Sequence, residues 1–275
     1  MNKILSVFLV LTAFLSLISC QPESEKISKG MGGLRLLATD APFGFENVDS
    51  ATVTINKISI RKKGGEKLMV LEKDITLDLL KLRNGVTEAL AELQIPTGVY
   101  DQISLVVTEA SVSLTNGEHF PLNVPSGDQS GLKIFISPAL TINEGIRSEV
   151  LLDFDLSRSF VPKGTHTEIT GFNFKPVIRA VSVVATGIIS GEVLDYDTGI
   201  SGATVTVTKG EEIIATAVTE VNGTFKVLGI PAGIYDVTAE RENYQTLKIN
   251  AVPVSAGSEV TTHFILSPLE NIAEI

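Results

Sequence analysis

From residue 33 onward, apolar and polar residues mostly alternate along the chain. Alternation with a period of two is typical of half-buried β-strands, because successive side chains in a strand point to opposite faces of the sheet. Two long runs, 50–67 and 100–114, switch the parity of their apolar positions partway, which indicates a β-bulge in each. Gly64 and Gly65 in the first run predict a hairpin turn. The pattern therefore predicts an all-β protein whose long strands bend around a core.

Two short segments depart from the alternation and are rich in helix-forming residues. They are LDLLKL at residues 77–82 and TEALAEL at residues 87–93. Leu, Ala and Glu favour helix, and Pro96 would stop a helix shortly after the second segment. We expect each segment to form one or two helical turns in a connection between strands.

The alternating pattern restarts near residues 185–187, which suggests a second domain. Residues 188–266 contain about seven short strand candidates at the spacing of a β-sandwich. Turn residues separate these candidates, and Asn222-Gly223 is a strong hairpin signal. We therefore predict two β-sandwich domains in tandem, residues 33–184 and residues 187–268.

One seven-residue motif occurs in both predicted domains. IPTGVYD at residues 95–101 returns as IPAGIYD at residues 230–236, each time leading into an alternating strand. Pro presets its own φ, Gly permits special turn geometry, and Tyr can bury its ring while its hydroxyl reaches the backbone. Both domains are expected to start a strand in the same way, either by convergence on a good turn or by duplication.

The N-terminus has the layout of a secretory signal peptide: MNK, then an apolar run over residues 4–18. That run is shorter than the roughly 20 residues a helix needs to span a bilayer. It closes in LISC, residues 17–20, which resembles a bacterial lipobox and contains the only cysteine, Cys20. The resemblance implies a lipoprotein signal peptide at 1–19 and a lipidated flexible tether at 20–32, with palmitate or similar acyl chains on Cys20.

The charge of the chain limits its partners. It has 22 Lys and Arg against 32 Asp and Glu, a net charge of −10. Such a chain is a poor ligand for nucleic acid, and anionic lipid headgroups repel it, so membrane attachment is expected to depend on acylated Cys20. Glu23 and Glu25 resemble the acidic signal that sends some lipoproteins outward. We expect a lipid anchor in the outer membrane, with exposure at the cell surface.

The second predicted domain resembles the carboxypeptidase regulatory-like family. The resemblance rests on SGEVLDYDTGISGATVTV and TEVNGTFKVLGIPAGIYDVTAERENY, which cover most of residues 190–244. Family members usually carry an Asp-Gly turn and a Gly-Tyr pair, and Asn222-Gly223 and Asn243-Tyr244 stand there in this chain. The resemblance implies a seven-stranded, prealbumin-like Greek-key sandwich.

The first predicted domain is similar to a family of bacterial lipoproteins known only as a domain of unknown function. The matching motifs fall in order over about 150 residues. They are ATDAPF at 38–43, DLLKLRNG at 78–85, LQIPTGVYDQISL at 93–105, VPSGDQSGLKI at 124–134, LLDFDLSRSF at 151–160 and FKPVIRAV at 174–181. This resemblance implies a fold and a location rather than an activity.

Two aspartates in LLDFDLSRSF are the first candidates for chemistry. In a strand, Asp153 and Asp155 point to one face, whereas Leu152, Phe154 and Leu156 point to the core. Both acids on one side of one strand do not suit a glycosidase, whose carboxylates flank a sugar. We expect them to form a polar face or to stabilise the following turn. The functional alternative is a calcium site, and both DFDLS and DYDTG lack the later ligands of an EF-hand.

A calcium site of another kind would need a further carboxylate. Asp40 or Asp128 could join Asp153 and Asp155. Apart from calcium, no cofactor is expected, because the three histidines lie in separate stretches and no nucleotide motif or nucleophile elbow occurs.

A polar loop is the other candidate binding site. The PSGDQSG segment, residues 125–131, offers backbone donors and small polar side chains. We name Ser126, Gly127, Asp128 and Arg158 as candidate ligand-binding residues, and a solvated hairpin loop as the alternative.

Together these features favour a non-enzymatic cell-envelope lipoprotein that presents two β domains to a ligand or partner. One alternative is a carbohydrate-binding accessory lipoprotein of a glycan-uptake system, because the regulatory-like fold resembles that of starch-binding modules. The chain has no Trp and four Tyr, and Tyr196 and Tyr244 are its turn-adjacent candidates for a sugar platform. Another alternative is a structural subunit of a surface assembly, so the expected partner is an envelope protein or a glycan.

Overall fold

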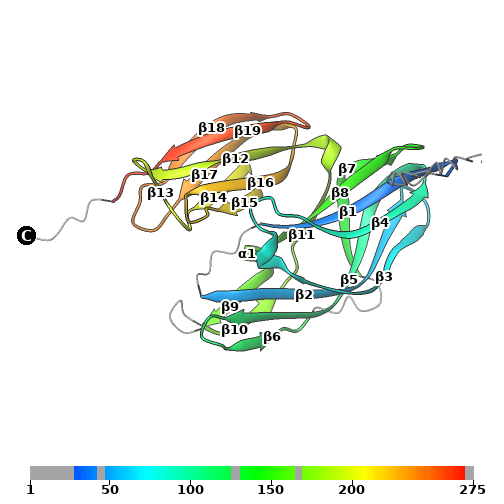
Figure 1. Ribbon diagram of the computed structural model, residues 1–275, viewed down its shortest axis with the longest axis horizontal. Helices are drawn as coiled ribbons and strands as arrows, with labels where there is room; N and C mark the ends of the chain where they lie inside the picture. Colours follow the sequence, from blue (N-terminus) through cyan, green and yellow to red (C-terminus); the bar gives the residue numbers. More distant parts are fainter. Residues whose placement is uncertain (1–27, 42–46, 125–130, 165–168, 270–275) are drawn as a thin grey trace, which may run out of the picture.

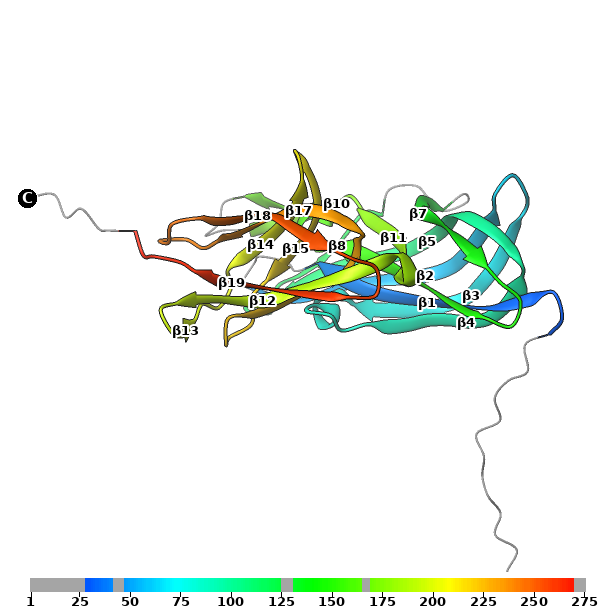
Figure 2. The ribbon, with the colours of Figure 1, turned by 90° about the horizontal axis from the view of Figure 1, so that it is seen from above.

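The computed structural model describes residues 28–41, 47–124, 131–164 and 169–269 (Figure 1). These residues form an all-β structure, as the alternation predicts, in two β-sandwich domains. Within the described ranges, no helix is long and apolar enough to cross a membrane. In both views the second domain lies toward one end of the molecule, and the first domain extends from beside it to the other end (Figures 1 and 2).

The first domain is built on one large sheet that folds into two layers. Its strands are β1 (Met31–Ala41), β2 (Val48–Lys62), β3 (Lys67–Asp78), β4 (Glu88–Pro96), β5 (Gly98–Leu114), β6 (His119–Pro121), β7 (Leu132–Ile142), β8 (Arg147–Asp155), β9 (Phe160–Gly164), β10 (Ile169–Phe174) and β11 (Ile178–Ser182). The order across the sheet is β3-β2-β5-β7-β11-β8-β1-β4, with β6 beside β5 and β9-β10 as a separate hairpin.

The large sheet bends between β7 and β11, in the middle of its strand order. Strands β7 and β11 meet through one residue pair, Ile136 and Ala180, so the two halves of the sheet are free to face each other. Their inner faces share one apolar core, which includes Leu36, Ile103 and Leu152. Figure 1 shows β2, β3 and β5 in one layer and β1, β4 and β8 in the other.

The second domain is a sandwich of two smaller sheets. Its strands are β12 (Thr186–Asp195), β13 (Thr198–Gly199), β14 (Thr204–Lys209), β15 (Glu212–Val218), β16 (Thr224–Pro231), β17 (Gly233–Glu240), β18 (Leu247–Val254) and β19 (Glu259–Ile265). One sheet has β12 between β16 and β19, with β13 beside the end of β12. The other has the order β15-β14-β17-β18. Seven strands and the two-residue β13 thus enclose a core around Phe264.

Of the two expected helical segments, one is a helix and the other is not. Residues Leu79–Leu82 form the 3₁₀ helix η1, which buries Leu79 and Leu82. The TEALAEL segment instead lies largely in β4, which pairs antiparallel with β1. Its helix-forming composition is a weak preference over seven residues, whereas pairing along β1 satisfies the backbone of the whole strand. The helix prediction for this segment was wrong.

Both predicted bulges are present in the long strands. Asn56 has no partner in the pairing of β2 with β3 or β5, and the register shifts there. Thr108 is skipped in the same way in β5, where Ile55 pairs with Val107 and Thr54 with Glu109. Each extra residue moves the apolar positions to the opposite parity, which explains why the sequence pattern switches. The predicted turn at Gly64 joins β2 to β3.

The repeated motif builds the same structure in both domains. Tyr100 is fully buried and its hydroxyl donates a 2.8 Å hydrogen bond to the carbonyl oxygen of Pro96. Tyr235 is 2% exposed and donates a 2.7 Å hydrogen bond to the carbonyl oxygen of Pro231. In each case one strand ends at the proline and the next begins at the glycine two residues later. The expectation of a shared way to start a strand is confirmed.

Candidate functional site

The two aspartates of β8 each have an arginine partner. Asp153 lies opposite Arg179 of β11, and its carboxylate accepts hydrogen bonds of 2.6 and 3.2 Å from that guanidinium. Burial raises the pKa of Asp153, and the charge and hydrogen bond of Arg179 oppose this rise. The ion pair ties the outer faces of two adjacent strands together.

Asp155 stabilises the turn that follows β8, as expected from the sequence. Its carboxylate accepts hydrogen bonds from the hydroxyl of Ser157 at 2.7 Å and the backbone amide of Arg158 at 3.0 Å. The Arg158 side chain adds a 2.6 Å ion pair to the second oxygen. These bonds make Asp155 the N-cap of the one-turn helix α1 (Leu156–Ser159). Arg158 therefore has a structural role here.

The face of β8 that carries these acids is not solvated. Asp153 is 7% and Asp155 is 6% exposed. Leu151 shares this face and contacts Leu37, Val181 and Leu228 in a small apolar cluster. Leu228 belongs to β16, so the second domain covers the outer face of the first domain at this point. The expected polar outer face is in fact a domain junction, and β8 is buried on both sides.

Asp40 lies at the same junction without a hydrogen-bond partner. It is 6% exposed, and neither carboxylate oxygen has a partner. Burial raises its pKa well above the ordinary value, and the nearby charges of Asp153 and Asp155 raise it further. The nearby backbone amide of Leu156, which makes no close hydrogen bond to the carboxylate, and the Arg83 charge oppose this rise. Burial and the two neighbouring carboxylates therefore favour the neutral form of Asp40 in the folded protein.

Asp40, Asp153 and Asp155, the candidate calcium ligands that the structure describes, do not form one coordination sphere. Among the described residues, no group of three or more His, Cys, Asp or Glu side chains is placed to hold a metal. Asp153 and Asp155 are bound by different arginines. Ser126, Gly127 and Asp128 lie outside the described residues, as does Cys20, so calcium binding and the polar-loop site remain predictions.

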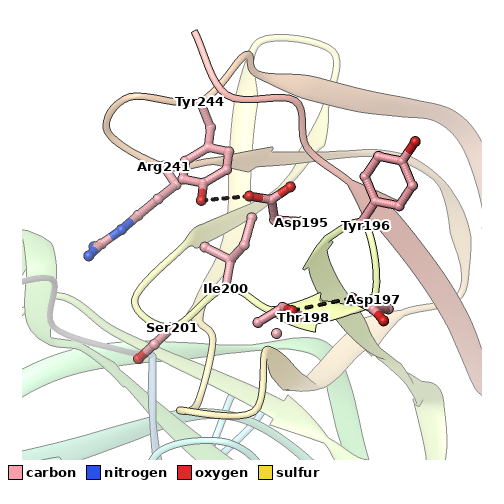
Figure 3. A pocket seen from close by; sticks show the side chains of 9 residues that line it. Asp195, Tyr196, Asp197, Thr198, Ile200, Ser201, Arg241 and Tyr244 are labelled. Carbon is pink, nitrogen blue, oxygen red and sulfur yellow. Dashed lines mark hydrogen bonds between the residues drawn. The ribbon is translucent and has the colours of Figure 1, made fainter.

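A different site opens in the second domain, at the turn that follows β12. This turn pocket has a volume of about 570 Å³ and is lined by residues 195–201, Arg241 and Tyr244. Figure 3 shows the two tyrosines on either side of Asp195, with Arg241 beside Tyr244 and Asp197 and Thr198 below Tyr196. The pocket thus combines two aromatic rings, two carboxylates, two hydroxyl side chains and a guanidinium.

The backbone conformation of Tyr196 costs the folded state free energy. It is the first residue of a two-residue turn, since Asp195 pairs with Thr198. Its φ is +60°, in the left-handed region that costs a side-chain-bearing residue roughly 1–2 kcal/mol. Its ring is 89% exposed, so it contributes little to the core. Strained backbone positions cluster at active sites and ligand-binding sites.

Tyr244 and Asp195 form the ordered side of the pocket. The Tyr244 hydroxyl donates a 3.1 Å hydrogen bond to the Asp195 carboxylate. This bond raises the pKa of Tyr244, because the neutral phenol is the form that donates to a charged carboxylate. Arg241, on the same side of the pocket as Tyr244, is held by a 2.9 Å hydrogen bond to the carbonyl oxygen of Gly202.

The base of the pocket depends on a close backbone contact. A Cβ atom on Gly199 would lie 2.1 Å from the carbonyl oxygen of Asn222, so only glycine fits there. The sequence identified both tyrosines and the DYDTG segment, yet it could not show that Arg241 and Tyr244 converge on that segment. The signal available was the turn-forming Arg-Glu-Asn-Tyr sequence.

The chain matches two family models. Residues 31–176 match the domain of unknown function DUF4382, and residues 188–267 match the carboxypeptidase regulatory-like domain. No curated protein matches the chain.

Several solved structures are similar to this chain, over shares of their own length that range from 58% to 98%. A type II cohesin–X–dockerin complex from Acetivibrio cellulolyticus is 27% identical over 30% of this chain, with a TM-score of 0.26. The match spans 58% of that chain. BcpA, the major pilin subunit of Bacillus cereus, is 13% identical over 86% of this chain and 70% of its own, with a TM-score of 0.25. GBS52, the minor pilin of Streptococcus agalactiae, is 8% identical over 88% of this chain and 98% of its own, with a TM-score of 0.26.

The first match covers more than half of the 275 residues, from β1 to the end of β10. The second covers the sandwich that contains the turn pocket. The chain therefore belongs to the DUF4382 family, and in it a carboxypeptidase regulatory-like domain follows the domain that defines the family.

Proposed function

We propose that this protein is a non-enzymatic lipoprotein of the cell envelope, anchored through acylated Cys20, which binds a carbohydrate in the turn pocket. The observation that supports a carbohydrate ligand is the placement of Tyr196. Its aromatic ring is exposed in a strained turn, between carboxylate and hydroxyl side chains. Aromatic rings give sugars an apolar platform, and the surrounding polar groups can bond their hydroxyls.

The polar groups of the turn pocket divide into two sets. Asp195 and Arg241 already have partners within the domain, so they are held in place for a ligand. Asp197 and Thr198 are exposed and bond only weakly to each other, at 3.3 Å. We expect the first set to fix the position of a sugar ring and the second to exchange water for its hydroxyls.

The absence of catalysis is part of the proposal. In the described parts of the chain, the acids of β8 are bound to arginines, and the acids of the turn pocket have no buried partner acid or nucleophile beside them. General acid–base chemistry on a sugar needs two carboxylates in unequal environments on either side of the bond. A measurable glycosidase activity that Asp195→Asn abolishes would contradict a pure binding role.

The ligand class can be tested with the whole mature chain carrying Cys20→Ser, which cannot be acylated. The protein is applied to a glycan array, and positive glycans are measured by isothermal titration calorimetry. Tyr196→Ala should weaken binding more than tenfold, since burial of a large ring against a ligand contributes about 1.5–3 kcal/mol. Tyr196→Phe keeps the ring and should bind nearly as well.

Val221 provides a matched control, because it is 83% exposed in another turn of the same domain and lies outside the pocket. Val221→Ala should not change binding. No binding on the array, or binding that survives Tyr196→Ala, would refute the carbohydrate proposal. In-cell crosslinking to one defined protein would then favour a structural subunit.

The anchor is tested separately by growing cells with an alkynyl palmitate analogue. The wild-type chain should be labelled and should fractionate with the outer membrane. Cys20→Ala should remain unlabelled.

A further inference from the structure

One end of the first domain is basic, although the protein as a whole is acidic. The turn between β2 and β3 reads RKKGGEK at residues 61–67. Arg61 is paired with Asp101, whereas Lys62, Lys63 and Lys67 are exposed. These three lysines form a local positive charge in a chain whose net charge is −10.

Hydrogen bonds place this turn beside the start of β1. The Lys62 ammonium donates a 2.9 Å bond to the carbonyl oxygen of Thr97. The backbone amide of Thr97 in turn donates a 3.0 Å bond to the carbonyl oxygen of Gly30. Exposed Lys29 is the neighbour of Gly30, so it joins the lysines of the turn. Figures 1 and 2 both show the start of β1 and the β2–β3 turn at the end opposite the second domain.

Exposed apolar side chains lie at the same end. Val99 is 38% exposed, and its carbonyl oxygen accepts a 2.8 Å bond from the amide of Lys63. Ile146 is 54% exposed, in a turn whose Gly145 amide bonds the carbonyl oxygen of Met31. We define the anchor-end surface as Lys29, Lys62, Lys63, Lys67, Val99 and Ile146.

Two exposed acids, Glu66 and Glu144, flank the anchor-end surface and leave it with a charge of +2. Its charge is thus opposite in sign to that of the whole chain. Lysines around small apolar side chains are the composition of surfaces that rest on anionic lipid headgroups. The overall charge predicts repulsion from such headgroups, whereas the charge of this end predicts attraction to them.

The proposed anchor keeps this end near a bilayer. Eight residue steps separate Cys20 from Ser28, where the described structure begins, and a fully extended chain spans at most about 3.6 Å per residue. If Cys20 is acylated, as proposed above, Ser28 lies within about 30 Å of the bilayer surface. At that distance a basic surface has a high effective concentration at the headgroups.

We propose that the anchor-end surface docks on anionic phospholipid headgroups and so orients the molecule with its second domain away from the membrane. The inference rests on the proposed lipid anchor for its biological setting. The surface itself consists of described residues and does not require the acyl chains in order to bind.

The test uses the whole mature chain with Cys20→Ser, so that no acyl chain contributes. Sedimentation is measured with vesicles of phosphatidylcholine alone and with 30% phosphatidylglycerol. We expect binding to the anionic vesicles in about 20 mM salt and loss of binding in about 500 mM salt, where the Debye length falls to a few ångströms.

The variant Lys63→Glu/Lys67→Glu should weaken binding at least about 25-fold, because it removes two attractive charges and adds two repulsive ones. Each lysine near an anionic surface contributes roughly fivefold, and two such factors correspond to about 2 kcal/mol at 1.4 kcal/mol per tenfold. The control variant Lys163→Glu/Lys209→Glu changes the same net charge at exposed positions elsewhere. It should bind like the parent chain.

No binding to anionic vesicles in low salt would overturn the proposal. Equal losses in both double variants would also overturn it, because attraction would then follow net charge rather than this surface. Either result would leave the palmitate labelling of Cys20 unaffected, so failure of the docking surface and failure of the anchor can be told apart.

Discussion

The buried tyrosine of the repeated motif offers a measurement that can be made twice in one molecule. Tyr100→Phe and Tyr235→Phe each remove one hydroxyl and keep the ring. The hydrogen bonds that disappear are 2.8 Å to the Pro96 carbonyl oxygen and 2.7 Å to the Pro231 carbonyl oxygen. No apolar area is lost, so the change in unfolding free energy reports the hydrogen bond itself.

A hydrogen bond of this kind contributes about 0.5–1.5 kcal/mol, because folding exchanges it for bonds to water. We expect about 1 kcal/mol for each variant. In a domain of about 80 residues this lowers Tm by roughly 4–8 °C, and in one of about 150 residues by roughly 2–4 °C. Tyr235→Phe should therefore shift the transition of the second domain more than Tyr100→Phe shifts that of the first.

Differential scanning calorimetry gives the two transitions, and hydrogen exchange assigns each to a domain. Tyr196→Phe serves as the control and should leave both unchanged, since its ring is 89% exposed. The reasoning fails if either buried variant unfolds like the parent chain. It also fails if Tyr235→Leu costs no more than Tyr235→Phe, because the ring would then add nothing.

Three further predictions concern the domain junction and calcium. Asp40→Asn should weaken the pH dependence of the unfolding free energy. The unfolded chain releases the Asp40 proton near pH 3.9, whereas the folded chain keeps it to higher pH, so the unfolding free energy falls as pH rises from about 3.9 through the raised pKa. Urea melts between about pH 4 and pH 8 should show a smaller fall in the variant than in the parent chain. Gly229→Ala should destabilise the domain junction by about 1–3 kcal/mol, because the added Cβ would lie 2.9 Å from the Val181 side chain at a φ of +67°. The variant should be cleaved faster by protease between residues 182 and 187. An unchanged cleavage rate would contradict tight contact between the domains. The Tm measured with calcium should equal the Tm measured with a chelator, because Asp153 and Asp155 are already bound by arginines. If calcium instead raises the Tm, and Asp128→Asn abolishes that increase, calcium binds at the polar loop.

The sequence was most informative where a pattern is local. Alternation identified the strands, and the parity switches at Asn56 and Thr108 located bulges because one extra residue reverses every later side chain. The repeated motif could be interpreted from its own residues, since the tyrosine donor and the proline acceptor are four positions apart. Such features depend on neighbours in the chain.

The sequence was least informative where residues distant in the chain meet. The β4 segment was mistaken for helix because its partner strand, β1, lies far away in the sequence. Asp153 was assigned to a polar face, although Leu151 on the same face was an apolar residue out of phase and could have signalled a second contact. The turn pocket likewise joins residues 195–201 to Arg241 and Tyr244, which the strand pattern alone does not bring together.

The burial of β8 on both faces has a consequence for other chains that contain the first domain. The family match ends at residue 176, yet Leu37, Leu151 and Val181 pack against Val183 and against Leu228 from the next domain. A chain that carried the first domain without this neighbour would expose a short apolar strip beside the Asp153–Arg179 ion pair. In such a chain this strip would be an apolar surface on which another domain or protein could dock.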